Sequence, residues 1–226
     1  LNELEDSRRA FVANVSHELR SPLTSMRGYV QGMLDGTIPP QDTSRYLNVV
    51  MAETNRLTSL VNDLLDLSRI ESGKFPMEKR PYDVCEQLRR IVIGFEGRID
   101  ARHADVDMQL PDKPLPVNAD QNRINQVISN LVDNAVKFLP ESGGVLRLEA
   151  LRQGEKVLIR VGDNGAAIPE KDLPHVFDRF YKVDKAHSGK GSGLGLSIAQ
   201  ELITRMDEEI SVGSEKDQGT PFTFTI

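Results

Sequence analysis

The chain has 226 residues, 38% hydrophobic and 27% charged, a balance typical of a soluble globular protein with a core of its own. A net charge of −6 and a pI of about 5.3 give no basic field, so no nucleic-acid partner is expected. The single Cys85 excludes an internal disulfide and suits a reducing compartment. No apolar run approaches the roughly 20 residues of a membrane helix. Because the first residue is Leu1 rather than methionine, we expect a fragment of a longer protein.

Two long helices are predicted within residues 1–72. Apolar residues recur in both at steps of three and four, which marks one face on each helix. The two faces comprise Val12, Val15, Leu19, Leu23, Met26, Val30 and Met33, then Leu47, Val50, Leu57, Val61 and Leu64. The segment 35–42 (DGTIPPQD) breaks the pattern and predicts a turn, and Gly73 ends the second helix.

A pair of helices leaves much of each apolar face in water. We therefore expect an antiparallel helical hairpin that dimerises into a four-helix bundle. The alternative is a hairpin that packs against its own C-terminal domain.

Residues after Gly73 mix strands with helices. Alternating apolar residues predict strands at 105–110, 156–161 and 222–226, and helices are predicted near 83–101, 120–138 and 194–206. This mixture indicates an α/β two-layer sandwich with one sheet face covered. The predicted domains are therefore 1–72 and 73–226, and the fold class is α+β.

In the first helix, His17 projects away from the apolar face. Val15 and Leu19 centre that face, and a helix turns about 100° per residue, so His17 points roughly 180° away toward solvent. The neighbouring Glu18 could hold one ring nitrogen and accept its proton, which leaves the other nitrogen more nucleophilic. Pro22 removes the backbone donor opposite the Glu18 carbonyl and predicts a kink or loosening. An incidental surface histidine is the alternative.

A polar line runs beside the apolar stripe of the predicted helix 120–138. It consists of Asn130, Asn134 and Lys137, at steps of four and three. Two carboxamide oxygens and an ammonium group aligned at the edge of a core suit a hydrated Mg²⁺ and phosphates. A solvated helix face is the alternative.

Two further segments suit a nucleotide. Asp163 stands where an apolar strand ends, so its carboxylate lies near the core and needs a hydrogen-bond donor, which an adenine amino group would provide. Four glycines between 189 and 195 lead into an amphipathic helix, whose first amides form an anion site. The spacing fits neither a P-loop nor a dinucleotide fingerprint, and a plain linker is the alternative.

Over essentially its whole length, the chain resembles the sensor histidine kinases of two-component signalling. The motifs that carry the resemblance stand in the family's order: SHELRSPL (16–23), NLVDNAVKF (130–138), DNGAAIP (163–169), FDRFYK (177–182), GSGLGLS (191–197) and GTPFTF (219–224). The resemblance implies a dimeric histidine-bearing helical domain and an ATP-binding domain of the Bergerat type, which Hsp90-like ATPases share.

The resemblance also implies roles for individual residues. His17 would be phosphorylated, and Glu18 would act as its base or orient it. Asn134 and Asn130 would hold Mg²⁺, and Asp163 would recognise adenine. The remaining ATP-binding residues would be Lys137, Gly165, Lys182, Gly191, Gly193, Leu194, Gly195 and Thr220.

Three positions depart from the family pattern. Ala167 and Asp207 each stand where a glycine is usual, which puts nucleotide affinity in question at Ala167. Ser21 replaces the threonine or asparagine that is often linked with phosphatase activity, so that activity stays open.

The expected function is an ATP-dependent protein histidine kinase. It would phosphorylate its own His17 and pass the phosphate to an aspartate on a response-regulator receiver domain. ATP and Mg²⁺ are the implied cofactors, and this part is expected in the cytoplasm, with the parent protein anchored in the membrane. Two alternatives stay open: a catalytically degenerate dimeric scaffold, and an Hsp90-like ATPase without phosphotransfer.

Overall fold

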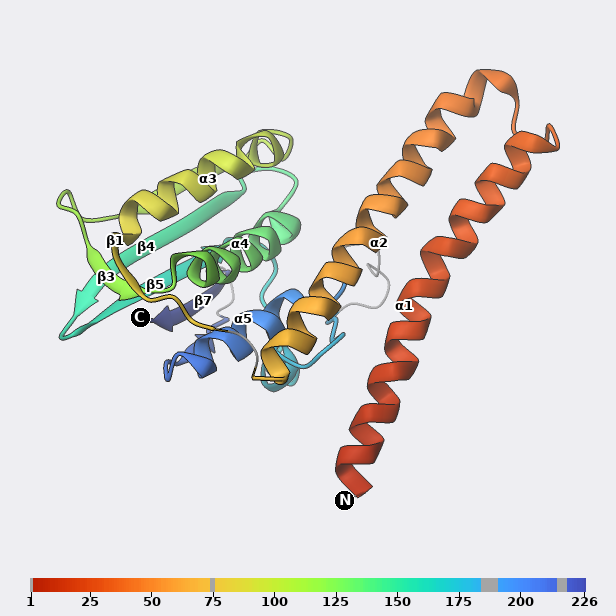
Figure 1. Cartoon of the computed structure of the whole chain (residues 1–226). Coiled ribbons are helices and arrows are strands. Elements are labelled where there is room, and N and C mark those ends of the chain that lie inside the picture. Colours follow the sequence, from red (N-terminus) through yellow and green to blue (C-terminus); the bar gives the residue numbers. More distant parts are fainter. Residues whose placement is uncertain (1, 74–75, 184–190, 215–218) are drawn as a thin grey trace. The chain divides into compact units, whose positions relative to one another are not determined.

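The computed structural model describes residues 2–73, 76–183, 191–214 and 219–226 (Figure 1). The chain divides into two compact units, which we call the helical unit (Leu1–Asp66) and the sheet unit (Leu67–Ile226). None of the described helices is long and apolar enough to span a bilayer. The predicted α+β fold class is confirmed, while the functional boundary after residue 72 stays a prediction.

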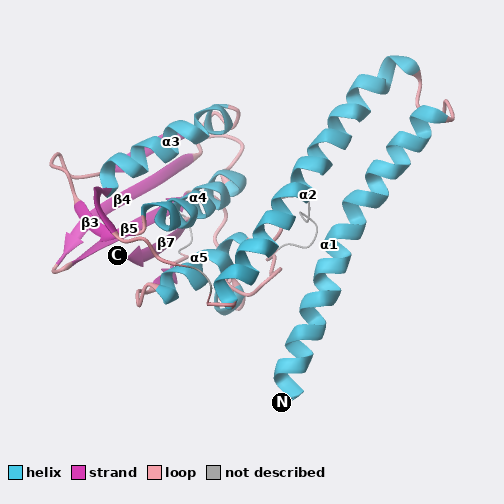
Figure 2. Cartoon of the chain, in the orientation of Figure 1, coloured by secondary structure: helices cyan, strands magenta, loops and turns pink. Residues whose placement is uncertain are grey.

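The helical unit is an antiparallel hairpin (Figure 2). Helix α1 spans Asn2–Leu34, a short 3-10 helix spans Pro40–Asp42, and α2 spans Thr43–Glu71, so that its last residues enter the sheet unit. The side chain of Asp35 shapes the turn by accepting hydrogen bonds from the amide and hydroxyl of Thr37, at 3.0 and 2.6 Å. Helix α1 continues through Pro22, and the loosening predicted there stays a prediction.

Within one chain, the two helices cover only part of their apolar faces. Pro22 is buried, and the side-chain hydroxyl of Thr54 on α2 donates to the sulfur of Met26 on α1. The uncovered apolar residues include Val12, Leu23 and Val30 on α1 and Leu47, Met51, Val61 and Leu65 on α2. Each helix therefore keeps an apolar surface that its own partner helix does not cover.

The described residues of the sheet unit form two sheets. Strand β1 (Arg80–Asp83) pairs antiparallel with β3 (Pro116–Ala119). The main sheet has five strands in the order β2-β4-β5-β7-β6, in which β2 is parallel to β4 and the other pairs are antiparallel. Its strands are β2 (Asp105–Gln109), β4 (Val145–Gln153), β5 (Lys156–Asp163), β6 (Ile210–Val212) and β7 (Thr220–Thr225).

Three helices cover one face of the main sheet (Figures 1 and 2). They are α3 (Val84–Asp100), α4 (Gln121–Phe138) and α5 (Gly195–Arg205), as predicted; a short 3-10 helix spans Leu173–His175. Asp83 and Asp120 cap α3 and α4, because their carboxylates accept hydrogen bonds from amides in the first helical turn. The core lies between this layer and alternate residues of the strands, such as Leu146, Leu148, Ile159 and Phe222.

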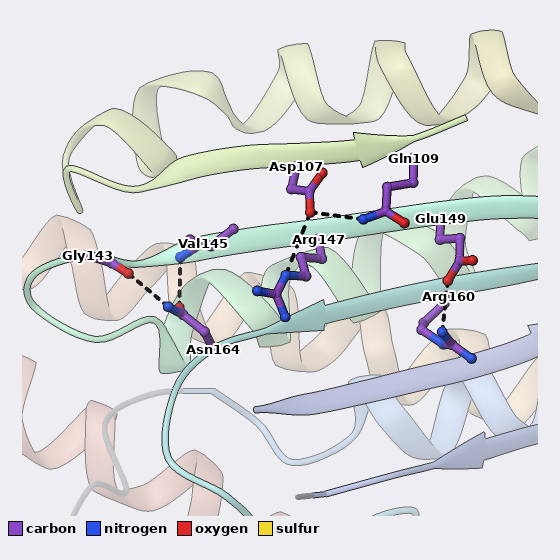
Figure 3. A network of polar contacts seen from close by, with 8 residues as sticks. All are labelled: Asp107, Gln109, Gly143, Val145, Arg147, Glu149, Arg160 and Asn164. Atoms are coloured by element: carbon purple, nitrogen blue, oxygen red, sulfur yellow. Dashed lines mark hydrogen bonds and ion pairs between the residues drawn. The ribbon is translucent and has the colours of Figure 1, made fainter. Parts of the chain in front are cut away.

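No helix among the described residues covers the other face of the main sheet, which carries charged side chains. Arg147 pairs with Asp107 at 3.7 Å, and Arg160 pairs with Glu149 at 2.8 Å (Figure 3). A hollow of about 750 Å³ lies on this face, lined by residues of β2, β4, β5, β6 and β7. The predicted two-layer sandwich with one covered sheet face is therefore confirmed.

Candidate functional site

His17 is exposed on α1, as its position opposite the apolar face predicts. Nothing in the described part of the chain hydrogen-bonds to its ring. The imidazole is thus available to a reaction partner from solvent.

Glu18 follows His17 in the sequence, but its carboxylate is directed to α2. Its Oε2 lies 3.3 Å from Nη2 of Arg56, and its side chain is 18% exposed. Adjacent residues of a helix point about 100° apart and do not face each other. The structure therefore does not bring Glu18 onto the His17 ring, and its role as a base stays a prediction.

Asp163 is a buried carboxylate at the end of β5, where the sequence places it. It is 4% exposed, and burial raises its pKa to about 6, although the hydrogen bond that Oδ1 accepts from the Gly165 amide at 2.8 Å opposes the rise. Its Oδ2 has no hydrogen-bond donor in the described residues. A ligand amino group that donated to this oxygen would stabilise the ionised form.

Thr220 lies across the strand pair from Asp163, on β7. Its hydroxyl is buried without a hydrogen-bond partner in the described part of the chain, so it also lacks the partner that buried polar groups normally have. Two glycines bring the backbone close here. A Cβ on Gly219 would lie 1.7 Å from the Asp163 carbonyl oxygen, and one on Gly165 would lie 2.1 Å from the Phe138 carbonyl oxygen. We call Asp163, Gly165, Gly219 and Thr220 the cradle. Its two polar groups without a full set of hydrogen-bond partners, the Asp163 carboxylate and the Thr220 hydroxyl, suit a purine.

Asn164 fixes the loop next to this cradle (Figure 3). Its Oδ1 accepts a hydrogen bond from the Val145 amide at 2.7 Å, and its Nδ2 donates to the Gly143 carbonyl at 2.8 Å. The end of β5 is thereby tied to the start of β4. Sequence reasoning assigned Asn164 no role, because DNG indicates only a turn.

The two asparagines on α4 fit a magnesium ion held partly by other ligands. Asn130 is half-buried, and its Nδ2 donates to the Gly195 carbonyl at 3.0 Å, which leaves its Oδ1 for a cation. The half-buried carboxamide of Asn134 has no hydrogen-bond partner in the described residues. The described residues contain no cluster of three or more His, Cys, Asp or Glu side chains. Mg²⁺ commonly takes few protein ligands and completes its shell with waters and phosphates, so these two oxygens suit it.

Lys137 connects α4 to the second glycine segment. Its ammonium pairs with Asp133, which also accepts from Arg98 at 2.7 Å, and it lies 3.0 Å from where a Cβ on Gly191 would stand. A cation is therefore placed beside exposed backbone, as an anion site requires. Sequence analysis did not identify Asp133, which shares the motif with the asparagines.

Leu194 and Gly195 anchor the second glycine segment at the start of α5. Leu194 is fully buried and Gly195 is the first residue of α5. The amide of Phe180 donates to the Gly193 carbonyl at 2.8 Å, so the segment is tied to the end of FDRFYK. Lys182 is half-buried. His187 and Gly189 belong to the stretch 184–190, which lies outside the described residues.

Comparisons with known proteins identify both units. Residues 7–73 match the His Kinase A (phospho-acceptor) domain, and residues 119–226 match the histidine kinase-, DNA gyrase B- and HSP90-like ATPase family. The sensor histidine kinase WalK of Bacillus subtilis (strain 168) is 40% identical over 99% of this chain, which spans 37% of that protein's length.

Solved structures of histidine kinases also resemble this chain. The catalytic domain of the histidine kinase ThkA is 30% identical, with a TM-score of 0.60, over 66% of this chain and 95% of that domain. ThkA in complex with the response regulator protein TrrA is 26% identical, with a TM-score of 0.81, over 100% of this chain and 63% of that one.

Proposed function

The chain belongs to the sensor histidine kinases of two-component signalling, and on this premise we propose that it is an ATP-dependent histidine autokinase. It phosphorylates His17 and passes the phosphate to an aspartate of a receiver domain. The observation that carries this proposal is that one chain holds an exposed His17 in its phosphoacceptor segment and a cradle with a buried, partly unsatisfied Asp163. The predicted domains, 1–72 for phosphotransfer and 73–226 for ATP, are part of the proposal.

ATP is the substrate that the sheet unit would hold. Asp163 accepts a hydrogen bond from the adenine amino group, and Gly165 and Thr220 complete that end of the site. Lys137 and Lys182 meet the phosphates together with the backbone of Gly191, Gly193, Leu194 and Gly195. Asn134 and Asn130 would hold Mg²⁺, which neutralises phosphate charge when bound.

In the reaction, one nitrogen of neutral His17 attacks the γ-phosphorus of ATP. A nitrogen–phosphorus bond forms, the bond from phosphorus to the bridging oxygen breaks, and ADP leaves. Glu18 takes the proton from the other ring nitrogen. The protein chiefly positions these groups, because phosphoryl transfer needs little covalent assistance.

The test is incubation with Mg²⁺ and γ-labelled ATP, followed by mapping of the modified residue. We expect one acid-labile label, on His17, and none in His17→Ala. Label in His17→Ala would refute the site. ADP release without any label would favour the ATPase alternative, and absence of nucleotide binding would favour the scaffold.

We also propose that the chain acts as a homodimer with a receiver-domain partner. The uncovered apolar residues on α1 and α2 support the dimer, because a second hairpin can cover them. The complex of ThkA with a response regulator supports a receiver as partner. A cytoplasmic position beside a membrane anchor, located elsewhere in a longer protein, stays a prediction.

A further inference from the structure

Arg56 on α2 lies between two carboxylates. Its Nη2 is 3.3 Å from Oε2 of Glu18 on α1, and its Nη1 is 3.9 Å from Oε2 of Glu53 on its own helix. The side chains of Arg56, Glu18 and Glu53 are 28%, 18% and 26% exposed, so solvent screens these charges only in part. One guanidinium therefore lies near two acidic groups.

The distances from Arg56 Nη2 to Glu18 Oε2 and from Arg56 Nη1 to Glu53 Oε2 are both long for an ion pair. Strong charge-assisted hydrogen bonds between nitrogen and oxygen measure about 2.7–2.9 Å, and both distances here exceed that range. Oε2 of Glu53 is buried and has no hydrogen-bond partner in the described residues. Arg56 is thus shared between the two carboxylates, and Glu53 has an acceptor that a small shift of the guanidinium would satisfy.

We propose that Arg56 is a positioning residue that exchanges between Glu18 and Glu53 and thereby controls when Glu18 assists His17. The inference rests on the proposed autokinase function. While Arg56 holds Glu18, the carboxylate is turned toward α2 and its charge is neutralised. When Arg56 moves onto Glu53, Glu18 can turn and take the proton of the His17 ring. Glu53 makes this movement inexpensive, because the guanidinium is not left unpaired in a half-buried place.

The exchange predicts opposite effects for substitutions at Arg56 and at Glu53. In Arg56→Gln, Glu18 loses the charge of the Arg56 guanidinium, so it becomes a better base and is released toward His17. In Glu53→Gln, Arg56 no longer has the Glu53 carboxylate to move onto, so it holds Glu18 more tightly. From the strength of partly exposed ion pairs, we expect the phosphorylation rate to rise about threefold to fivefold in Arg56→Gln and to fall by about the same factor in Glu53→Gln.

The decisive measurement is a double-mutant cycle on His17 labelling at saturating Mg·ATP. Glu53→Gln should slow the wild-type chain but change nothing in the Arg56→Gln background, because its effect passes through Arg56. The ATP concentration that gives half the maximal rate should stay constant, since none of these residues belongs to the sheet unit. Arg9→Gln is the matched control, because it removes an exposed arginine–glutamate pair on α1, and its rate should equal that of wild type.

Two results would overturn the exchange. One is an equal effect of Glu53→Gln in both backgrounds. The other is a slower Arg56→Gln whose rate Arg56→Lys restores, which would make Arg56 a static support. Helix content and dimer mass of each variant, measured by circular dichroism and light scattering, separate a folding defect from both. A wild-type chain that takes no label on His17 would instead refute the proposed function.

Discussion

The sheet unit buries its apolar residues within one chain, whereas the helical unit does not. In the sheet unit, Leu146, Leu148 and Ile159 are fully buried, and the exposed large apolar residues are spread over several elements: Ile93 on α3, Val106 on β2, Phe138 on α4, Leu151 on β4, and Val183. In the helical unit, Met51 is 61% exposed and Leu65 is 51% exposed, on a helix whose Leu47 and Val61 are also uncovered. The two units therefore differ: one has a core of its own, and the other leaves an apolar surface that a second copy would cover in the proposed dimer.

The same contrast holds for their chemistry. Asp163 gains a raised pKa by being buried, which readies it for a ligand that brings a hydrogen-bond donor. His17 stays in solvent, where more than one partner can reach it. A recognition site profits from a fixed, dry environment, and a group that both receives and gives away a phosphate profits from access.

Breaking the dimer should have the largest effect. In Met51→Glu/Leu65→Glu, a dimer would bury four unpaired carboxylates, so we expect it to dissociate at least about 1000-fold more readily. Sedimentation velocity would show a monomer in which the α2 helix loses thermal stability while the sheet unit keeps its own transition. Ile93→Glu, the matched control in the sheet unit, should leave the mass unchanged. A double variant that stays dimeric would reject α2 as the interface.

Asp163→Asn tests the role of the buried carboxylate in the sheet unit. Replacing the carboxylate removes a charge-assisted hydrogen bond, so ATP affinity should fall roughly 10- to 100-fold, as calorimetry can measure. The free protein should become more stable at pH 7, by about 2–3 kcal/mol, because burial of the ionised group is relieved. Gain of affinity, or loss of stability at pH 7, would contradict the adenine role argued from its burial.

The pH dependence of this stability difference follows from the raised pKa of Asp163. Asp163 has a folded pKa of about 6, above the ordinary 3.8, so the wild-type fold is favoured by protonation. That contribution is complete below pH 3.8 and is lost as the pH rises through 6. The advantage of Asp163→Asn should therefore be largest at pH 7 and vanish near pH 3.8, in urea titrations that follow the sheet unit. Asp105→Asn, at an exposed position on β2, is the matched control in the same titrations.

Sequence periodicity predicted α3, α4 and α5 because each has an apolar stripe, and Asp83 and Asp120 also provide start signals before α3 and α4. It missed β4, whose sequence VLRLEALRQ is rich in leucine, alanine, glutamate and arginine, all good helix formers. Pairing with β2 on one side and β5 on the other overrides that preference. Such long-range pairing has no local signal.

The candidate site divides in the same way. Asp163 and the glycines were selected because a predicted strand ends or a helix begins there, and Asn130 because it lies on a polar line with Asn134 beside the apolar stripe of a predicted helix. The direction of Glu18 could not, because proximity in sequence to His17 suggested a contact that helix geometry disfavours. Its partner, Arg56, is 38 positions away and on another helix.

The smallest predicted effect concerns Ala167 and Asp207, which stand where glycine is usual in the family. Outside glycine, the described residues with positive φ are His103, Phe180 and Asp207, so Ala167 is not strained. Asp207 has a φ of 60° in the turn after α5, where its amide donates to the Thr204 carbonyl at 3.1 Å. Since glycine adopts this conformation without the steric cost of a Cβ, Asp207→Gly should stabilise the sheet unit by about 1 kcal/mol.

Ala167→Gly is the control for Asp207→Gly, because it replaces a side chain at an exposed position that needs no left-handed backbone. It should lower the stability of the sheet unit slightly, since glycine adds freedom to the unfolded chain. Urea midpoints of both variants, read from the sheet unit alone, decide the matter. If Ala167→Gly stabilised the fold more than Asp207→Gly, backbone strain would not explain how this chain departs from its family.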